Sequence, residues 1–550
     1  MGSGRVHVWF RSRLPFVGDR NHVPVLLLGD SAEWAGDPQG AYMAGAASLV
    51  FDGASESMTI RTSLVSLPPV FLYQDDRCSV VASDPYLIAG VPDVRLELDP
   101  LAVVQLGAIG HPVQHRTLFR RTQLLPAGAR ITAGPGGVRV EPEWRMPPAE
   151  PAAWDAFIES QIGAFRRAVH RLDASRSVLS LTAGLDTRTV FAALAAENRL
   201  VPAVTISGAR PSLDARTAAE LCRAYSVPHQ IVTLDDRFTR ALPQLVQQAS
   251  RFSGGLESLE QTPDIFMYHE LGGRFGARLS GNLGNQVGRG GTEGVGLRGA
   301  SLDILSAAVR EQSRGANDGH WLLAKLDGDR TAAMEFILQQ EIPFTSVGNY
   351  SVGSHFAVQQ SPYADSALVA TLALKPADNL AAPSGSLLRM RLRDLNHRFF
   401  GEPAHTSFQR TLLQRIGGFA ARYPINYGWR ASGGVSPAGF ALGVATLLGM
   451  VAQKQGLDDG PVGDIVARTG LPSLHNFRRS THWLRRHLRE FTHDVLGERT
   501  IRNTGLFDVP ALTRVVEEHF SGRRDHHETV VFALDVALAH QTFCTKGRAL

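Results

Sequence analysis

Cysteine is nearly absent from this sequence, which has 3 cysteines among its 550 residues. They are Cys78, Cys222 and Cys544, and no two of them form a CxxC pair. Disulfide frameworks and zinc sites need several closely spaced cysteines, so the sequence argues against both. So few cysteines are typical of a reducing compartment, and we expect a cytoplasmic protein.

Neither sign of charge is in large excess. Lysine and arginine number 56 and aspartate and glutamate 52, which leaves a formal charge of +4. A charge this small is compatible with a phosphate-bearing ligand but does not require nucleic acid. The arginines between 478 and 489 predict the solvated face of a helix rather than an RNA-binding surface. We therefore expect no nucleic-acid partner.

Long apolar runs are scarce as well. The first residues, MGSGRVHVWFRSRL, place arginines where the apolar part of a signal peptide would begin. One uncharged run, at 431–453, is about long enough to cross a bilayer. Pro437 and several glycines interrupt it, so we interpret it as a buried loop and helix and expect no membrane partner.

A chain of this length is too long for a single core and predicts two or three domains. The proline-rich stretch PEWRMPPAEPAAW, at 142–154, is typical of a linker. We accordingly place a first domain at 1–145 and a second domain at 153–550.

One glycine-rich stretch, SGGLES at 253–258, differs by one carboxylate from SGGLDS, a loop type that binds the pyrophosphate of ATP. Such a loop needs a strand before it and a helix after it, so that backbone N–H groups converge on the phosphates. The residues before SGGLES, RALPQLVQQASRF, instead have apolar positions at helical spacing. We therefore predict that SGGLES ends a helix, with Gly254 and Gly255 as its caps.

A second loop, TAGLDT at 182–187, has the required neighbours. The apolar strand SVLSL (177–181) precedes it, and the alanine-rich helix TRTVFAALAAEN follows it. Further strands are predicted at 200–207 and from His229, with a helix between them. This alternation predicts a parallel α/β sheet with the loop at the carboxyl end of the first strand, where such sheets bind ligands.

The residue types of TAGLDT suit a phosphate site. Thr182 and Thr187 offer hydroxyl donors, Gly184 permits close backbone approach, and Asp186 can hold a magnesium ion. Ala183 departs from this pattern, because glycine would tolerate unusual backbone angles there. The hexamer taken alone is better explained as a plain strand-to-helix turn.

The order of the motifs resembles the asparagine synthetase family, which includes the β-lactam synthetases. In that family an SGGLDS loop is followed by a strand, an acidic helix ending in a small residue-Pro-His, a second loop of the type SGxGxDE-FGG, and an RxPFLDxxLV-type segment. The similar segments here are TAGLDT, the helix containing Asp214 with VPH at 227–229, SGNLGNQVGRG at 280–290, SPYADSALV at 361–369, and the carboxy-terminal stretch from His482 to His527.

The first part of the chain resembles the partner domain of that family, a glutaminase. VFLYQDDRCSVVASDP (70–85) and the stretch at 117–144, with a GPGG hairpin turn, are similar to its paired strands. In a working glutaminase the second residue is a cysteine whose own amine activates the thiol, whereas here it is Gly2. Cys78 stands mid-chain, far from a free amine that could act as its base. We expect a structural remnant without glutaminase activity.

The resemblance implies an α+β sandwich of the N-terminal nucleophile (Ntn) hydrolase type, followed by an α/β parallel-sheet PP-loop domain with a helical carboxy-terminal part. It also implies ATP and Mg²⁺ as cofactors. Asp186 and Asn285 correspond to the metal ligands, and Asn282 is the candidate catalytic residue. The positions implied to bind ATP and pyrophosphate are Thr182, Ala183, Gly184, Leu185, Asp186, Thr187, Ser280, Gly281 and Gly284.

The second loop departs from the family in its carboxylates. Asn282, Asn285 and Gln286 are amides where the family has acidic residues, or a tyrosine at the first of these positions. An asparagine carbonyl can coordinate a metal but brings no negative charge, and it cannot act as a general base. Glu293 could replace a lost carboxylate, although a solvated loop charge is the simpler interpretation.

Three functions stay open at this point. The first is an ATP-dependent ligase that adenylates a carboxylate and joins it to an amine or ammonia, with small-molecule or peptide substrates in specialised metabolism. The second is a catalytically weakened relative that binds nucleotide or a partner protein. The third is glutamine-dependent asparagine synthesis, which similarity suggests and Gly2 disfavours.

Overall fold

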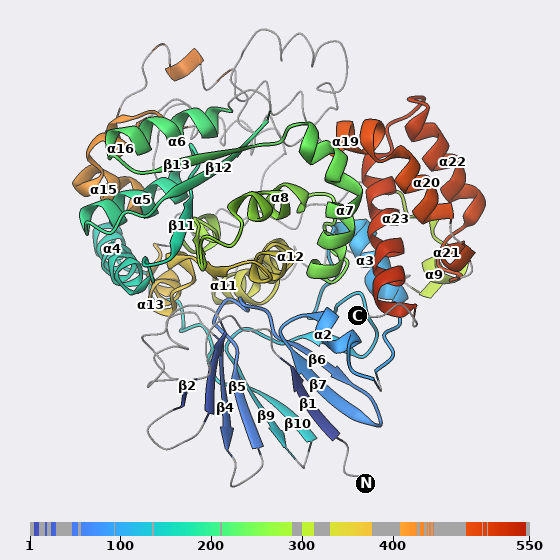
Figure 1. The fold of residues 1–550 in the computed structure, drawn as a ribbon. Coiled ribbons are helices and arrows are strands. Elements are labelled where there is room, and N and C mark those ends of the chain that lie inside the picture. The colour runs from blue at the N-terminus through green and yellow to red at the C-terminus, as the bar shows by residue number, and fades with distance from the viewer. Residues whose placement is uncertain are drawn as a thin grey trace.

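A computed structural model of the chain has a mixed α/β architecture with many helices (Figure 1). It describes residues 5–9, 17–18, 24–28, 47–52, 57–92, 94–134, 137–208, 212–288, 300–312, 330–376, 407–425, 430–433, 480–497, 499–502 and 504–545, with a few single positions between 437 and 444.

Two β-sheets form the first part of the chain, drawn in blue at the bottom of Figure 1. Ile60 and Ile131 of one sheet form a single buried cluster with Leu72 and Val81 of the other, so the sheets pack face to face. One sheet has the order β1 (Arg5–Trp9), β7 (Cys78–Ala82), β6 (Phe71–Gln74), β8 (Thr122–Leu124), and the other β10 (Gly137–Pro142), β9 (Ala129–Gly134), β5 (Ser57–Arg61), β4 (Ala47–Asp52), β3 (Pro24–Leu28), β2 (Val17–Gly18).

The paired strands expected in this part are present. β6 and β7 are antiparallel, and β9 and β10 form a hairpin in which Gly134 lies opposite Gly137. One pairing was not foreseen: β1 runs parallel to β7, with Arg5 opposite Cys78. Cys78 is thus far from the first strand in the sequence but lies next to it in the fold. The thiol is instead withdrawn from solvent, since Cys78 is 4% exposed.

A five-stranded parallel sheet forms the second part, as the alternation of strands and helices predicts. Every pair of neighbours in it is parallel. The chain builds outward from the central strand in one direction and then returns to build on its other side, so the order reverses between β11 and β14. The order is β13 (His229–Thr233), β12 (Ala203–Ser207), β11 (Ser177–Ser180), β14 (Ala277–Leu279), β15 (Val358–Gln360).

Helices connect the strands of this sheet, and the carboxy-terminal helices, drawn in red, gather at one side of it (Figure 1). Those up to β15 are α4 (Trp154–Arg171), α5 (Leu185–Ala196), α6 (Leu213–Ala224), α7 (Asp236–Ser253), α8 (Thr262–Leu271), the π-turn η2 (Gly284–Gly288), η3 (Leu302–Ile304), α9 (Ala307–Gln312), α11 (Arg330–Phe336), η4 (Ile337–Glu341) and α12 (Ile342–Ser354). Those after it are η5 (Pro362–Ala364), α13 (Ser366–Ala370), η6 (Thr371–Leu374), α15 (Ser407–Ile416), α16 (Gly418–Arg422), α19 (Ser480–His487), α20 (Arg489–Gly497), α21 (Arg499–Arg502), α22 (Val509–Phe520), α23 (His527–Ala539) and η9 (His540–Cys544).

The first part and the carboxy-terminal helices share one core. The sequence of α3 (Pro100–Ile109) is apolar almost all round, which is typical of a buried helix. Its Gly107 lies so close to Phe532 of α23 and to Leu302 that a methyl group there would meet both. A short helix, α2 (Pro85–Ala89), lies between β7 and α3 in the sequence. α3 of the first part thus packs against α23.

The proline-rich stretch at 142–154 lies along the second part. The N–H groups of Glu150 and Ala152 donate to the carbonyls of Ala373 and Leu374, both at 2.9 Å. Trp154 then begins α4. These contacts hold the segment in place, and the boundaries of the two domains remain predictions.

Most of the uncharged run at 431–453 lies outside the described residues. Among the helices that the structure does describe, none is both long enough and apolar enough to cross a membrane.

Candidate functional site

Two loops meet at the point where the strand order of the parallel sheet reverses. TAGLDT follows β11, and the loop that begins at Ser280 follows β14, so both lie at carboxyl ends of neighbouring strands. They are in direct contact: a Cβ atom on Gly281 would lie 2.6 Å from the amide nitrogen of Thr187, and one on Gly284 would lie 2.4 Å from Cγ of Asp186. Open parallel sheets bind ligands in this crevice.

The amino-terminal end of α5 resembles an anion-binding site. Gly184 is its N-cap and offers no side chain to cap the first turn, which contains Leu185 and Asp186. The first N–H groups of a helix have no partner within the helix, and together with the helix dipole they attract anions. This end of α5 can therefore receive a phosphate group.

The loop before α5 is held in shape by its own side chains. The hydroxyls of Thr182 and Thr187 lie 2.9 Å apart, and they accept from the N–H groups of Gly184 and Thr182, respectively, both at 3.2 Å. The N–H of Ala183 donates to Oδ1 of Asp214 at 2.7 Å. The two hydroxyls thus brace the loop, and their expected role as phosphate donors stays a prediction. The N–H groups of the first turn of α5 add further donors for an anion.

Asp186 is bound by two segments that are far away in the sequence. Nε2 of Gln409, from α15, donates to Asp186 Oδ1 at 2.6 Å. The hydroxyl of Tyr363, from the SPYADSALV segment, donates to the backbone carbonyl of Asp186 at 3.2 Å. Gln409 and Tyr363 are both fully buried, whereas Asp186 is half-buried.

The second loop is tied to the same segment. The hydroxyl of Ser361 donates to the carbonyl of Asn282 at 2.6 Å, and the N–H of Asn282 reaches Ser280 Oγ at 3.4 Å. Leu283 has a φ of 68°, a left-handed conformation that is uncommon for residues with side chains. The chain then enters η2, where Asn285 is half-buried and Gln286 is buried. Asn282, half-buried, and Asn285 therefore border the contact between the loops.

A buried arginine fixes TAGLDT from behind. The guanidinium of Arg188, one turn into α5, donates to the carbonyls of Ala183 at 3.2 Å, Tyr423 at 2.6 Å and Pro424 at 2.9 Å. Burial lowers the pKa of Arg188 to about 10, which still leaves the group charged at neutral pH. The loop is thereby joined to the chain that follows α16.

Few carboxylates are available for a metal. Among the described residues no group of three or more histidine, cysteine, aspartate and glutamate side chains could hold an ion. Glu293, considered above as a substitute, lies outside the described residues. A magnesium ion would depend on Asp186, on amide oxygens such as that of Asn285, and on the phosphates and waters that Mg²⁺ usually keeps.

SGGLES lies at the end of a helix, as the helical spacing before it predicts, and it also forms a junction with a second helix. It follows α7, which ends at Gly254 in a left-handed conformation with φ of 73°. A Cβ on Gly255 would lie 2.6 Å from Ala539 of α23, and the N–H of Ser258 donates to Oδ1 of Asp535 at 3.1 Å. The loop therefore packs against α23 instead of following a strand.

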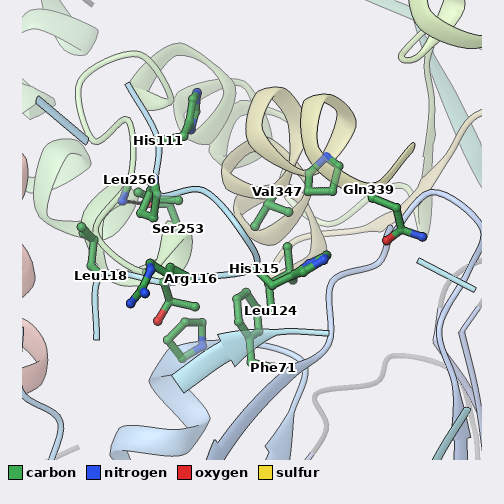
Figure 2. A pocket seen from close by; sticks show the side chains of 15 residues that line it. Phe71, His111, His115, Arg116, Leu118, Leu124, Ser253, Leu256, Gln339 and Val347 are labelled. Atoms are coloured by element: carbon green, nitrogen blue, oxygen red, sulfur yellow. Dashed lines mark hydrogen bonds between the residues drawn. The ribbon is translucent and has the colours of Figure 1, made fainter. Parts of the chain in front are cut away.

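A small pocket lies beside this junction. Figure 2 shows its wall, to which Ser253 and Leu256 of the junction contribute together with His115 of the first part and Val347 of α12. Its cavity volume of about 40 Å³ has room for a few water molecules and not for a nucleotide. Burial lowers the pKa of His115, so its imidazole is neutral at neutral pH.

Comparisons with known proteins add no relative. A scan against models of protein families and a search of curated proteins both found no match for this chain.

Sequence reasoning identified both loops and missed Gln409. The segment at 361–369 was singled out by resemblance, but nothing in it indicated that Tyr363 reaches the backbone of Asp186. Gln409 belongs to an amphipathic helix whose pattern predicts only packing. An alignment of related chains is the signal that would have pointed to it.

Proposed function

We propose that this protein is an ATP-dependent C–N ligase that forms an acyl-adenylate from a carboxylate substrate and couples the acyl group to an amine or ammonia. One observation carries the proposal. TAGLDT, the loop from Ser280 and the SPYADSALV segment, which follow one another in the motif order of the asparagine synthetases, meet at one edge of a parallel sheet around Asp186.

The residues present suit ATP with Mg²⁺ in three respects. The first turn of α5 has uncapped N–H groups, a carboxylate stands on that turn, and a buried acceptor, Oε1 of Gln409, has no hydrogen-bond partner among the described residues. Among the positions implied to bind ATP and pyrophosphate, Leu185, Asp186 and Thr187 lie in the first turn of α5, and Gly281 and Gly284 lie against that turn. Magnesium, when bound by Asp186 and Asn285, would neutralise phosphate charge.

The reaction then follows from the chemistry of the substrates. A carboxylate oxygen attacks the α-phosphorus of ATP, the bond from that phosphorus to the bridging oxygen breaks, and pyrophosphate leaves. The amine nitrogen attacks the acyl carbon, loses a proton, and AMP leaves. The helix end of α5 stabilises the negative charge of the leaving pyrophosphate. Asn282 can orient a substrate by hydrogen bonds but cannot take up the proton of the amine.

The lack of a carboxylate at three positions of the second loop favours a second candidate. Asn282, Asn285 and Gln286 leave Asp186 as the acidic residue of the two loops, and a protein with this loop could bind nucleotide without turnover. Production of AMP and pyrophosphate on addition of carboxylate and amine substrates distinguishes the ligase from this weakened relative. Asparagine synthesis fed by glutamine is a third candidate, which Gly2 disfavours.

The first experiment measures ATP binding by titration calorimetry in the presence of Mg²⁺. The wild-type protein is expected to bind, and Asp186→Asn is expected to lose the binding, because the neutral amide no longer attracts the metal. The matched control is Glu257→Gln, the same kind of change in SGGLES, which is expected to bind like wild type. Equal affinities in wild type and Asp186→Asn would reject the site, and a large loss in Glu257→Gln would move it to the other loop.

A further inference from the structure

Gln409 joins the two segments that hold Asp186. Its Nε2 donates to Oδ1 of Asp186 at 2.6 Å and to the hydroxyl of Tyr363 at 2.8 Å. That hydroxyl in turn donates to the carbonyl of Asp186 at 3.2 Å. The two hydrogens of one amide nitrogen thus serve two acceptors. A carboxylate can only accept, so the nitrogen and not the oxygen of Gln409 faces Asp186.

The other end of the same amide has an unmet requirement. Oε1 of Gln409 is buried and has no hydrogen-bond partner among the described residues, and the side chain is 0% exposed. Leaving a buried acceptor without a donor costs about 1–3 kcal/mol. The unpartnered Oε1 of Gln409 therefore lowers the stability of the folded protein. Such a cost is typical of a residue whose role is to bind a ligand.

The donor that Gln409 offers to Asp186 is also uncharged, and this matters for metal binding. An arginine or lysine at 409 would pair with the carboxylate and cancel the charge that a metal ion needs. An amide gives the carboxylate a fixed direction and leaves its charge in place. Gly288 allows the approach, because a Cβ on it would lie 2.9 Å from the ring of Tyr363 and 3.3 Å from Nε2 of Gln409.

We infer that Gln409 is a positioning residue for magnesium: one N–H of its Nε2 orients the Asp186 carboxylate, and its Oε1 would accept a hydrogen bond from a water that a bound Mg²⁺ retains. This inference rests on the proposed function, because it assigns a role at the same ATP site. It extends the site to a residue of α15 that no motif contains.

The test measures ATP binding by calorimetry over a series of Mg²⁺ concentrations in Gln409→Met, an unbranched change of similar size. Losing a hydrogen bond to a charged group is expected to raise the half-saturating Mg²⁺ concentration about tenfold. ATP affinity at saturating Mg²⁺ should stay close to that of wild type. A merely structural role would weaken binding at every Mg²⁺ concentration.

The matched control is Gln414→Met on the same helix, where Nε2 of Gln414 donates to the carbonyl of Ala431 at 2.9 Å, and it should leave the Mg²⁺ requirement unchanged. If Gln409→Met does not fold, Tyr363→Phe removes one hydroxyl of the network and should raise the requirement by a smaller factor. An unchanged Mg²⁺ requirement in Gln409→Met, or in Tyr363→Phe where Gln409→Met does not fold, overturns the inference. ATP binding by the wild-type protein would still support the proposed function. Absence of ATP binding in wild type overturns both.

Discussion

At the scale of single residues, glycine decides how closely the two loops approach. The Cα of Gly284 lies against the side chain of Asp186, and the Cα of Gly281 lies against the backbone of the same turn. Neither glycine has a positive φ, so glycine is not needed there for its backbone conformation. It is needed because a side chain would not fit. The same argument applies to Gly288 below the ring of Tyr363.

Gly284→Ala is expected to destabilise the protein by about 1–3 kcal/mol, because overpacking forces a shift of Asp186 or of η2. The measurement is urea denaturation followed by fluorescence, together with ATP titration, which should weaken as the carboxylate moves. Gly497→Ala is the control: Gly497 ends α20 with no atom within 4 Å of an added Cβ, so no loss is expected there. Equal effects at the two glycines would contradict the close contact of the loops.

At the scale of elements, the junction at 253–258 joins three bodies of structure. α7 ends there, Gly254 packs against Pro85 of the first part, and Ser258 bonds to Asp535 of α23. Both the N–H and the hydroxyl of Ser258 donate to the same oxygen of Asp535, which is fully buried. The serine that resembles part of a phosphate loop is used to attach a helix.

A double-mutant cycle on Ser258 and Asp535 tests this attachment. Asp535→Ala leaves the donors of Ser258 buried without that acceptor and is expected to cost about 1–3 kcal/mol. Ser258→Ala with Asp535→Ala should cost less than the sum of the single changes by at least about 0.5 kcal/mol, as measured by urea denaturation. ATP affinity of the folded variants should be unchanged. Additive losses would show that the pair does not act as a unit.

At the scale of the whole molecule, the first part and the carboxy-terminal helices are packed together. α3 of the first part lies in one core with α23, and the pocket of Figure 2 is lined by both the first part and the helices around the parallel sheet. The first part therefore contributes buried surface to the rest of the protein, whether or not it has chemistry of its own.

We expect no release of glutamate from glutamine, even with ATP and a carboxylate present. Gly2 supplies no thiol, and Cys78, although opposite Arg5, is buried in β7. The measurement is incubation with amide-¹⁵N glutamine, with glutamate quantified against enzyme concentration. Glutamate that rises with enzyme and disappears in Cys78→Ala would overturn this assignment of the first part.

Local sequence was sufficient for the elements. The apolar run before TAGLDT, the alanine-rich helix after it and the helical spacing before SGGLES predicted β11, α5 and α7, because periodicity and turn residues act over a few positions. The GPGG turn between β9 and β10 followed in the same way. Each of these predictions depends only on the residues of the segment itself.

Only the tertiary structure decided which segments meet. Asp186 and Gln409 are 223 residues apart, and Asp186 and Tyr363 are 177 apart, so no local pattern relates them. The parallel pairing of β1 with β7 was likewise invisible, since pairing between distant strands depends on how whole sheets pack. The sequence by itself determined TAGLDT together with the strand before it and the helix after it. Packing decided the contacts around Asp186, because the orientation of this half-buried carboxylate depends on the donors that the fold brings to it.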